Sequence, residues 1–579
     1  MVTRRAFLYS SAAVLANVSV LKSSSALVLP QRSSPTDYSS AIEKIKQLLP
    51  IAMAMRDITG ASIALVDGDN IVWSEGFGYT NRSLKVKVTG DTLFHAGSIS
   101  KSFAALGALK AVEKNLIDLD APLKKYLPWF SVNSRFGGSE VERITIRHLL
   151  AHHSGLGTWA PLGNPSDTAY HTRTFEEVVK STTGSWLKSP AGERFEYCNQ
   201  GIDLAGYALA VVSGKSYEDF MREEILVPLG MTTSTFNQRE ATAKEACATG
   251  YLGKRSVPIV NGVVHPLVAA GGLLASANDL ARFIIFHLQS GAAKGKQILP
   301  ATLLKEMHAP QFTAKHQISG YGLGIYKALQ NDTVRFSHGG LGYGISTHYR
   351  FLPEHKIGVV LLTNQDTAHN APQLAGRVIE LMLTAKLGTA PKNNPVSVKE
   401  RRVVSLGEET LRRLEGTYLL YEGILFHFRY EKGDLFHILG NEKLKLASVS
   451  PTEFVSGSRL YRFLLAENGR PKGVQIIDDY YDPQTAENSV IYLHVNDTPG
   501  DAQGLRKSEW SRLTGKYAGT FIGVNSEVKV SLENGHLYLN ERLKLREHST
   551  KSFICADGES VIFEGDQLLV GNKLYFRKG

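Results

Sequence analysis

Hydrophobic periodicity changes character once along this chain of 579 residues, and the change limits the kinds of structure it can form. Residues 39–387 mix helical and strand periods, whereas the sequence after residue 405 has short alternating runs separated by Gly, Asn and Asp. Alternation with a period of two is typical of antiparallel strands with one buried face. Gly, Pro and Asn collect between the two regions, so we predict a linker at 388–405. We expect one large α/β or α+β domain followed by all-β structure.

Local patterns place several elements in the first region. The turn residues 67–70 stand between two short β-type runs, which predicts a hairpin. Ser276 and Asp279 have the spacing of a helix N-cap pair. The run at 357–362 is a continuous apolar stretch, as in a strand buried on both faces. The expected elements are strands at 61–64, 71–74 and 357–362 and helices at 98–115, 276–289 and 373–386.

An internal repeat marks the second region. The words LEGTY at 414–418 and NEKLKL at 441–446 recur as LTGKY at 513–517 and NERLKL at 540–545. Both offsets are the same, since 513 − 414 = 540 − 441 = 99 residues. Repeated hairpins would expose strand edges unless the sheet closes on itself. We therefore predict two related barrel-like units, either two barrels or two halves of one barrel, at 406–507 and 508–579.

Composition excludes several classes of function. Lys and Arg total 65 against 55 Asp and Glu, a formal charge of 65 − 55 = +10, but no dense basic tract occurs, so we expect no nucleic-acid partner. The three cysteines, Cys198, Cys247 and Cys555, are far apart and odd in number, which argues against a disulfide framework or a Cys-rich zinc site. The adjacent His152 and His153 suggest no third ligand, so we expect no metal.

The first 26 residues have the pattern of an export signal. Arg4 and Arg5 precede an apolar stretch at 6–21, and no acidic residue occurs. The run TRRAFL at 3–8 resembles a bacterial twin-arginine signal, with a general secretory signal and an uncleaved anchor as alternatives. No other segment is long and apolar enough to span a bilayer. We expect a periplasmic or secreted protein without a stable membrane span after signal removal.

Ser98 and Lys101 are the first candidates for chemistry. Residues three apart share a helix face, so the lysine amine can reach the serine hydroxyl at the start of a helix. A hydroxyl needs a base beside it to become a good nucleophile, and a lysine can serve when its pKa is lowered from about 10.4. The helix start also offers free backbone N–H groups to an oxyanion. The Ser-x-x-Lys pattern occurs elsewhere in the chain, so its meaning depends on the motifs that accompany it.

Two further motifs follow in order along the chain. Tyr197 and Asn199 would lie on the same side of an extended segment, and a phenol beside a cation is a competent general acid or base. In the run SHGGL at 337–341, the two glycines would let a ligand lie close to the backbone of a strand and leave N–H groups free to bind it.

Together these motifs resemble the serine β-lactamase and penicillin-binding-protein superfamily, in particular its class C β-lactamase-like branch of D-alanyl-D-alanine carboxypeptidases, D-aminopeptidases and esterases. The resemblance extends over 39–387 and implies an α+β domain, with an antiparallel sheet flanked by helices plus an all-helical region, followed by C-terminal β-barrel additions. Further matching runs are HLLAHHSGL at 148–156, PAGERFEY at 190–197, PLGM at 228–231, GGLLAS at 271–276 and YGLG at 321–324.

The resemblance also implies roles for single residues. Ser98 would be the acylated nucleophile, Lys101 its proton partner, and Tyr197 the base that also protonates the leaving group. Asn199 would hold a substrate amide. The backbone N–H groups of Ser98 and Leu341 would form the oxyanion hole.

One position departs from the pattern of the superfamily. His338, Gly339 and Gly340 stand where many relatives carry Lys-Thr-Gly. A histidine is neutral much of the time near pH 7, so a fixed positive charge for a β-lactam carboxylate is missing. We therefore expect peptidase or esterase activity rather than efficient β-lactamase activity.

The resemblance implies a serine hydrolase that needs no cofactor, and it leaves several substrate classes open. Our first hypothesis is a peptidase or amidase acting on short or D-amino-acid-containing peptides, including cell-wall peptides. A carboxylesterase is the second, and a β-lactamase or D-alanyl-D-alanine carboxypeptidase the third. From a different class, the protein could be a non-catalytic binding module whose β-units hold a ligand. The oligomeric state and the contribution of the β-units to the site stay open.

Overall fold

The computed structural model describes residues 36–389 and 403–578 with short gaps. The predicted export signal at 1–26, most of the predicted linker and Cys555 lie outside the described residues. The gaps are 135, 164–168, 244–246, 258–261, 264–265, 314–318, 331–332, 343, 367–369, 420–424, 440–441, 457–458, 466–467, 479–490, 495–506, 522–523, 534–535, 541–542, 550–551, 555–559 and 571–572.

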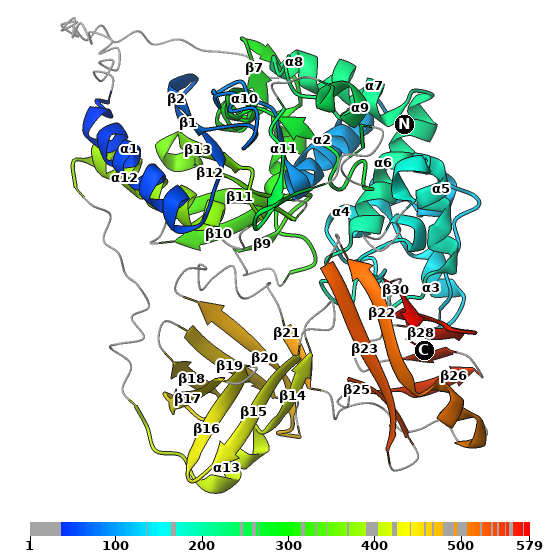
Figure 1. The fold of residues 1–579 in the computed structure, drawn as a ribbon. Coiled ribbons are helices and arrows are strands. Elements are labelled where there is room, and N and C mark those ends of the chain that lie inside the picture. Colours follow the sequence, from blue (N-terminus) through cyan, green and yellow to red (C-terminus); the bar gives the residue numbers. More distant parts are fainter. Residues whose placement is uncertain are drawn as a thin grey trace, which may run out of the picture. The chain divides into compact units, whose positions relative to one another are not determined.

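An antiparallel sheet of seven strands organises the first region (Figure 1). Its strand order is β2-β1-β13-β12-β11-β10-β9, so the beginning and the end of the region pair side by side as β1 and β13. The strands are β1 (Gly60–Asp67), β2 (Asn70–Gly78), β9 (Gly320–Tyr321), β10 (Tyr326–Gln330), β11 (Thr333–Gly342), β12 (Ile345–Leu352) and β13 (Ile357–Thr363).

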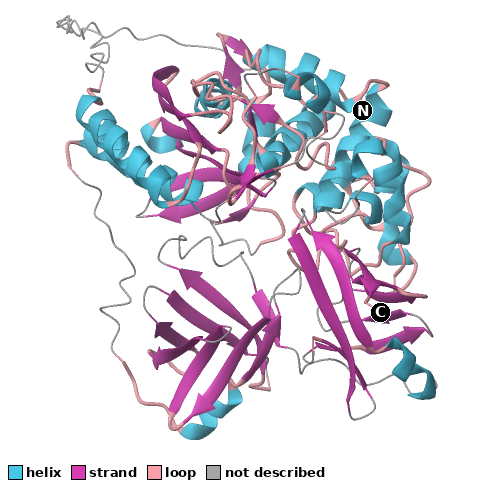
Figure 2. Ribbon diagram, viewed as in Figure 1, coloured by secondary structure: helices cyan, strands magenta, loops and turns pink. Residues whose placement is uncertain are grey.

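Helices cover both faces of this sheet (Figure 2). In β13, Val359 and Leu361 belong to the core shared with α1 and α12, whereas Val360 and Leu362 belong to the core shared with α2 and α10. Successive side chains of a strand point to opposite faces, so a strand covered on both sides needs apolar residues throughout. The covering helices are α1 (Ser39–Met55), α2 (Ser100–Glu113), α10 (Ala277–Leu288), α11 (Ala301–His308) and α12 (Asn370–Leu387).

A helical region is inserted between α2 and the second half of the sheet. It supplies part of the larger core, through residues such as Leu149, Ile202 and Phe220. Its helices are α3 (Ser139–Glu142), α4 (Ile146–Leu150), α5 (Phe175–Lys180), α6 (Asn199–Ser213), α7 (Tyr217–Met221), α8 (Val227–Leu229) and α9 (Gln238–Thr242). Three small two-stranded sheets pair β3 (Phe94–His95) with β6 (Leu274–Ala275), β4 (Tyr251–Leu252) with β5 (Arg255–Ser256), and β7 (Ala292–Ala293) with β8 (Lys296–Gln297).

The elements predicted for the first region are present. The hairpin forms as β1 and β2, and the doubly buried strand as β13. At α10, the Ser276 hydroxyl accepts a hydrogen bond from the Asp279 N–H at 3.2 Å, which is the predicted N-cap. One helix starts later than predicted, because Ser98 lies in a 3₁₀ turn (Gly97–Ile99) and α2 begins at Ser100. All neighbouring strands of this sheet are antiparallel, so the domain belongs to the α+β class.

The second region contains two separate β-units. The first is a closed barrel of eight strands, and the second is a nine-stranded sheet with the order β25-β24-β23-β22-β30-β29-β28-β27-β26. The first comprises α13 (Glu408–Arg413), β14 (Gly416–Leu419), β15 (Leu425–Glu431), β16 (Asp434–Leu439), β17 (Glu442–Ser448), β18 (Glu453–Ser456), β19 (Arg459–Leu465), β20 (Pro471–Asp478) and β21 (Ile491–His494). The second comprises β22 (Gly515–Phe521), β23 (Val524–Glu533), β24 (His536–Leu539), β25 (Leu543–Lys544), β26 (Arg546–Ser549), β27 (Ser552–Ile554), β28 (Ser560–Glu564), β29 (Gln567–Val570) and β30 (Lys573–Arg577).

The two units share one strand plan. In the second unit the edge strands β25 and β26 are consecutive and joined through Leu545 alone, so they form one interrupted strand and the sheet closes through it. Counted this way, each unit has eight strands in up-and-down order. Each also has its own aromatic core, around Phe428 and Phe463 in the first and Phe553 and Phe563 in the second. The repeat therefore encodes two barrels rather than two halves of one, and closure removes the exposed edges.

The sequence repeat has a structural counterpart at the start of each unit. The Tyr418 hydroxyl donates to the carbonyl oxygen of Leu414 at 2.9 Å, and the Tyr517 hydroxyl donates to that of Leu513 at 2.9 Å. Both tyrosine side chains are buried, so each needs a partner for its hydroxyl. The repeated word Leu-x-Gly-x-Tyr thus places a tyrosine on the first strand and its acceptor at the end of the preceding helix, which is α13 in the first unit and a 3₁₀ helix (Lys507–Leu513) in the second.

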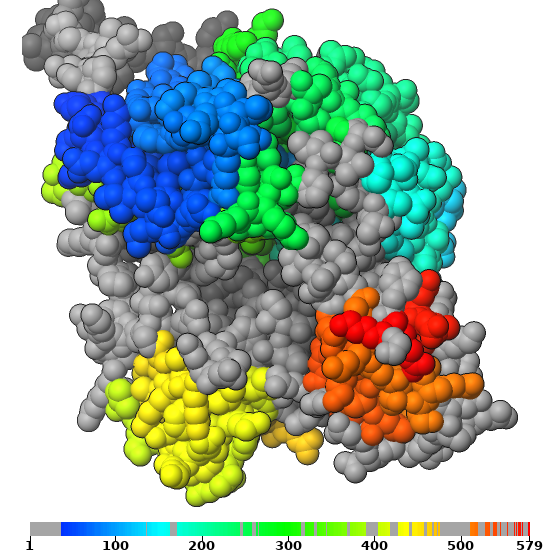
Figure 3. Space-filling model, viewed as in Figure 1, coloured from blue at the N-terminus to red at the C-terminus, as the bar shows by residue number. Residues whose placement is uncertain are grey.

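The surface of the first domain includes the outer side of α1, shown in dark blue in Figure 3. Ile51 and Met55 are exposed there. Within the described residues, no helix combines the length and apolar character needed to cross a membrane.

Two histidines, His287 buried and His308 partly buried, predict how acid affects the stability of the first domain. His287 Nδ1 and His308 Nε2 lie 2.8 Å apart and share a hydrogen bond, with Phe351 stacked on His287, Phe336 stacked on His308, and Phe283 edge-on to His287. Burial lowers the pKa of His308 to about 3 and that of His287 well below 6.5. The unfolded chain therefore takes up protons that the folded chain refuses, and stability is lost as the pH falls below about 6.5.

We expect each of these histidines to contribute a loss of about 1.4 kcal/mol in the free energy of unfolding per pH unit below about 6.5. Urea midpoints measured at pH 7.5 and pH 5 should therefore differ less in the double variant His287→Leu, His308→Leu than in the wild type. An equal difference in both proteins would contradict this account.

Candidate active site

Ser98 lies at the junction between β3 and α2. It sits in the 3₁₀ turn Gly97–Ile99 and is partly exposed, while Gly97 and Ile99 are buried. Gly97 has φ +55°, and a Cβ there would lie 3.1 Å from the Cα of Gly340, so only glycine fits this turn without strain. The turn thus presents the Ser98 hydroxyl at the start of a helix, where backbone N–H groups lack intrahelical partners.

Lys101 is fully buried in the first turn of α2. Its Nζ donates to the Ser98 Oγ at 2.9 Å and to the carbonyl oxygen of Ala270 at 2.8 Å. Burial lowers the pKa of Lys101 to about 7, and the negative charge of the Asp203 carboxylate opposes that shift. A substantial fraction of the amine is therefore neutral near pH 7 and can accept the proton of the hydroxyl.

Tyr197 approaches the same amine from the helical region. The Lys101 Nζ lies 4.8 Å from the centre of the Tyr197 ring, and Tyr197 is partly exposed. Cys198 has extended backbone angles and is the N-cap of α6, so Asn199 is the first residue of that helix. The predicted extended segment therefore ends before Asn199, because the backbone turns into the helix there. The two-residue alternation of an extended segment does not determine on which side the Asn199 amide lies. The buried Asn199 Oδ1 finds no hydrogen-bond donor among the described residues.

His152 supports the segment that carries Tyr197. The backbone N–H of Cys198 donates to His152 Nδ1 at 3.1 Å, and the rings of His152 and Tyr197 lie 4.4 Å apart. His152 has φ +61°, an unusual conformation for a non-glycine residue, and burial lowers its pKa well below 6.5. No sequence pattern indicates this contact, which joins residues 46 positions apart.

His338 is held by its own neighbours on the sheet. Its Nδ1 lies 2.8 Å from the carbonyl oxygen of Gly339, so Nδ1 carries the proton and Nε2 accepts from the Tyr321 hydroxyl at 3.0 Å. Burial and the nearby Lys101 lower the pKa of His338 to about 3. Both ring nitrogens are engaged in an uncharged imidazole, so this position offers a ligand mainly backbone groups.

The end of β11 extends beyond its pairing with β10. Pairing between β10 and β11 reaches only Tyr326 and Ser337, whereas pairing with β12 continues to Gly342. The turn that carries Ser98 packs against this stretch, since a Cβ on Gly97 would lie 3.3 Å from the backbone nitrogen of Leu341. The backbone nitrogens of Ser98 and Leu341 therefore belong to adjoining segments, while the Leu341 side chain is half exposed.

One of the two predicted glycines is needed for a different reason than space for a ligand. A Cβ on Gly340 would lie 2.1 Å from the carbonyl oxygen of Ala96 and 2.4 Å from the Thr347 Oγ1. Gly340 is therefore required by the close approach of the backbone that carries Ser98, not by space for a ligand. Gly339 is partly exposed, and a Cβ there would meet His348 Nδ1 at 3.2 Å.

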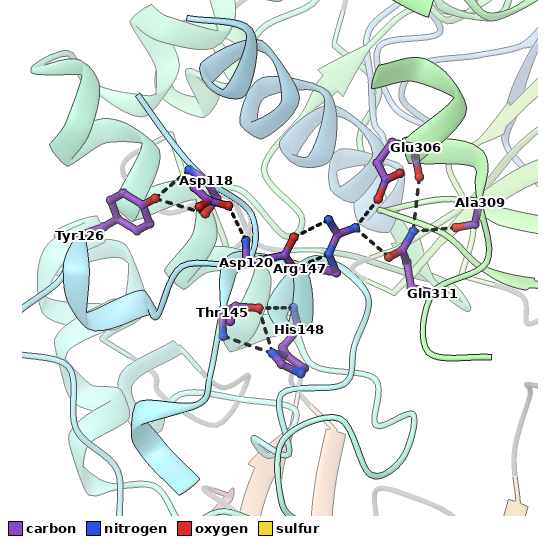
Figure 4. Close-up of polar contacts among 9 residues, drawn as sticks. All are labelled: Asp118, Asp120, Tyr126, Thr145, Arg147, His148, Glu306, Ala309 and Gln311. Atoms are coloured by element: carbon purple, nitrogen blue, oxygen red, sulfur yellow. Dashed lines mark hydrogen bonds and ion pairs between the residues drawn. The ribbon is translucent and has the colours of Figure 1, made fainter. Parts of the chain in front are cut away.

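A polar network around Arg147 ties the helical region to α11 and Gln311 (Figure 4). Arg147 of α4 forms two hydrogen bonds to Asp120, at 2.6 and 2.8 Å, and also pairs with Glu306 of α11. Its Nη1 donates to the Gln311 Oε1 at 2.9 Å, and the Gln311 backbone N–H donates to the carbonyl oxygen of Tyr321 at 2.9 Å. These carboxylates hold the pKa of Arg147 above its usual value. The network thus reaches the partner of His338.

The fold and the site define a class of protein. A partly exposed serine, a buried lysine and a tyrosine meet at a strand edge of a class C β-lactamase-like α+β domain, which is the arrangement of a serine-hydrolase-type protein. The family model described as Beta-lactamase matches residues 45–382. The chain belongs to this family, whose members include β-lactamases and penicillin-binding proteins.

Curated relatives match the first region at moderate identity. Protein flp of Staphylococcus aureus (strain N315) is 27% identical over 331 residues, which cover 56% of this chain and 64% of that protein. The chain thus spans just under two-thirds of the length of that relative. Penicillin-binding protein 4 of Amycolatopsis lactamdurans is 27% identical over 323 residues, which cover 54% of this chain and 82% of that protein.

Solved structures share more of the chain. The octameric penicillin-binding protein homologue from Pyrococcus abyssi aligns with a TM-score of 0.52 and 26% identity, over 76% of this chain and 98% of that one. SurE, solved with D-Leu, aligns with a TM-score of 0.54 and 21% identity over the same shares, and shows the fold alone. These alignments cover more of the chain than the family match does, so the likeness is not confined to residues 45–382.

The packing of Gly340 generates a prediction. Gly340→Ala places a methyl group against the carbonyl oxygen of Ala96, so we expect the Ser98 turn to shift and the rate of Ser98 acylation to fall about 100-fold, as misplaced reacting groups do. The rate can be followed with a fluorophosphonate probe. As a control, Gly138→Ala adds a methyl group with nothing within 4 Å and should leave the rate unchanged. Unaltered labelling in Gly340→Ala would show that the turn tolerates the methyl group.

Proposed function

We propose that this protein is a serine hydrolase that forms an acyl-enzyme on Ser98 and cleaves amide bonds in short or D-amino-acid-containing peptides. The observation that carries the proposal is the 2.9 Å hydrogen bond from Lys101 Nζ to Ser98 Oγ, in which the lysine is fully buried. A lysine kept there with a pKa of about 7 is suited to activate a hydroxyl, and a purely binding module has no need of one.

The proposed reaction begins with attack of the Ser98 Oγ on the substrate carbonyl carbon. The hydroxyl proton passes to the neutral Lys101 amine, and the N–H groups of Ser98 and Leu341 hold the oxyanion. The C–N bond then breaks as Tyr197 delivers a proton to the departing amine. Water then attacks the acyl carbon and gives its proton to the deprotonated Tyr197, the Lys101 ammonium returns its proton to Ser98 Oγ, and the free acid leaves.

The uncharged His338 supports a substrate without a carboxylate at this wall of the site. A cation at that position would pair with the carboxylate of a β-lactam or of a peptide C-terminus, but burial and its two hydrogen bonds keep His338 neutral. This favours cleavage next to an uncharged group over carboxypeptidase or β-lactamase activity.

A carboxylesterase is the second candidate, because the same serine, lysine and tyrosine would also serve an ester. The buried Asn199 Oδ1 favours the amide, since it lacks a donor among the described residues and a substrate N–H would supply one. We further propose that the reaction takes place outside the cytoplasm, where cell-wall peptides are available, because residues 1–26 have the pattern of an export signal.

Loss of the lysine amine tests the chemistry directly. We expect Lys101→Ala to slow fluorophosphonate labelling of Ser98 by 100- to 10,000-fold, roughly the contribution of a positioned base. Ser98→Ala gives the unlabelled background. Lys110→Ala removes a partly exposed lysine from the same helix and should label at the wild-type rate. Undiminished labelling of Lys101→Ala would refute the role of this amine.

A pair of substrates tests the missing charge. We expect D-alanyl-D-alanine amide to be hydrolysed with a kcat/KM about 10- to 100-fold higher than D-alanyl-D-alanine, because a buried carboxylate without a partner forfeits a charged hydrogen bond. p-Nitrophenyl acetate and nitrocefin, assayed alongside, measure the esterase and β-lactamase activities. Faster turnover of the free acid or of nitrocefin would favour the carboxypeptidase or β-lactamase alternative.

A further inference from the structure

Asp203 is a buried carboxylate in the helix that begins at Asn199. It lies four residues after Asn199, on the same face of α6, and is 2% exposed. Its Oδ1 accepts a hydrogen bond from the backbone N–H of Ala270 at 2.8 Å, and the N–H groups of Val268 and Ala269 also face it. A buried carboxylate is costly unless hydrogen bonds or a charge compensate it, so this position invites a functional explanation.

Ala270 connects Asp203 to the amine of Lys101. The backbone N–H of Ala270 donates to Asp203, and its carbonyl oxygen accepts from Lys101 Nζ at 2.8 Å. The same segment also supports the Ser98 turn, since the Leu273 carbonyl oxygen accepts from the Ala96 N–H at 2.8 Å. A single stretch of backbone therefore fixes the position of the amine and of the turn that carries Ser98, and Asp203 anchors that stretch.

Asp203 also acts on Lys101 through its charge. Of the groups that oppose the effect of burial on the lysine, the Asp203 carboxylate has the largest influence. The histidines facing the amine, His152 and His338, are buried and neutral. The titratable and charged groups around the pair are Tyr197 and Cys198 before α6, His152 after α4, His338 on β11, and Tyr217 on α7 facing Asp203.

We infer that Asp203 is a positioning residue for acylation: it fixes the Lys101 amine through Ala270 and stabilises the ammonium that forms when the amine takes the Ser98 proton. The inference rests on the proposed function. As the bond between Ser98 Oγ and the substrate carbonyl carbon forms, one proton moves from Oγ to Nζ, and the positive charge appears in a buried place where Asp203 is the counter-charge.

The electrostatics agree with this role. Burial raises the pKa of Asp203 to about 7 and lowers that of Lys101 to about 7, so the two groups titrate as an interacting pair in the working range of an enzyme. Removing the carboxylate charge lowers the pKa of Lys101, because an opposite charge nearby favours the ammonium. Without that charge, the neutral Lys101 amine persists to lower pH, but it is a weaker base.

The experiment is the pH dependence of Ser98 labelling by an uncharged fluorophosphonate in the full-length protein. Asp203→Asn keeps an oxygen for the Ala270 N–H and removes the charge. We expect the acid limb of its profile to move about one pH unit lower, and its plateau to fall by up to about tenfold because the base is weaker. Asp203→Ser also removes the charge and carries the same test if the Asn variant does not fold.

Asp279→Asn is the matched control. Asp279 is 1% exposed and accepts backbone N–H groups of Thr233 and Ser234 at 3.0 and 2.9 Å, as Asp203 accepts that of Ala270, but it has no contact with Lys101. We expect this variant to lose stability and to keep the acid limb of its labelling profile at the wild-type pH. If Asp203→Asn loses rate equally at every pH, with its limb unmoved, Asp203 only maintains the fold and the inference is overturned.

The two proposals fail in different ways. If wild-type Ser98 is not labelled at any pH, the proposed function fails before the Asp203 variants are compared. If wild-type Ser98 is labelled with a sigmoidal pH dependence, the proposed function stands and the position of the limb in the Asp203 variant decides the inference alone.

Discussion

The enclosure of the Lys101 amine is the constraint on which the site depends. An amine that is fully buried needs acceptors, and it finds them in the Ser98 hydroxyl and the Ala270 carbonyl oxygen. Burial lowers its pKa toward neutrality, which a surface lysine would not show. The same enclosure keeps the neighbouring His152 and His338 uncharged. Lys101 and the Asp203 carboxylate behind it are therefore the groups of the site that change charge near neutral pH.

The antiparallel sheet makes this enclosure possible. β11 extends beyond the end of its pairing with β10. The turn that carries Ser98 packs against this unpaired stretch of β11. Contact at that distance is only possible because Gly97 and Gly340 lack side chains. From the other side, α6 brings Asn199 and Asp203, while Arg147 joins the helical region to the segment before Tyr321. Each wall of the site thus comes from a different part of the domain, and packing rather than chain proximity holds them together.

The two β-units share a structural feature that their short sequence repeat encodes. Each begins with a helix and a first strand linked by a buried tyrosine hydroxyl, from Tyr418 to Leu414 and from Tyr517 to Leu513. The second unit breaks one strand at Leu545, yet the order of the others is unchanged. Closure needs only the order of the strands and a filled interior, so most positions outside the Leu-x-Gly-x-Tyr word could diverge between the copies.

Neighbouring residues were enough to predict the local elements: the β1–β2 hairpin, the doubly buried strand β13, the Ser276 cap and the three-residue spacing that puts Lys101 beside Ser98. Each depends on residues a few positions apart, where periodicity and helix geometry fix the contact. The family resemblance added Tyr197 and His338 as neighbours of that pair. Four features became visible in the folded chain alone: Asn199 begins a helix, Gly340 accommodates Ala96, His338 accepts a hydrogen bond from Tyr321, and Asp203 holds Ala270. These contacts join segments far apart in the chain, and a sequence pattern carries no information on which distant backbone groups packing will bring together.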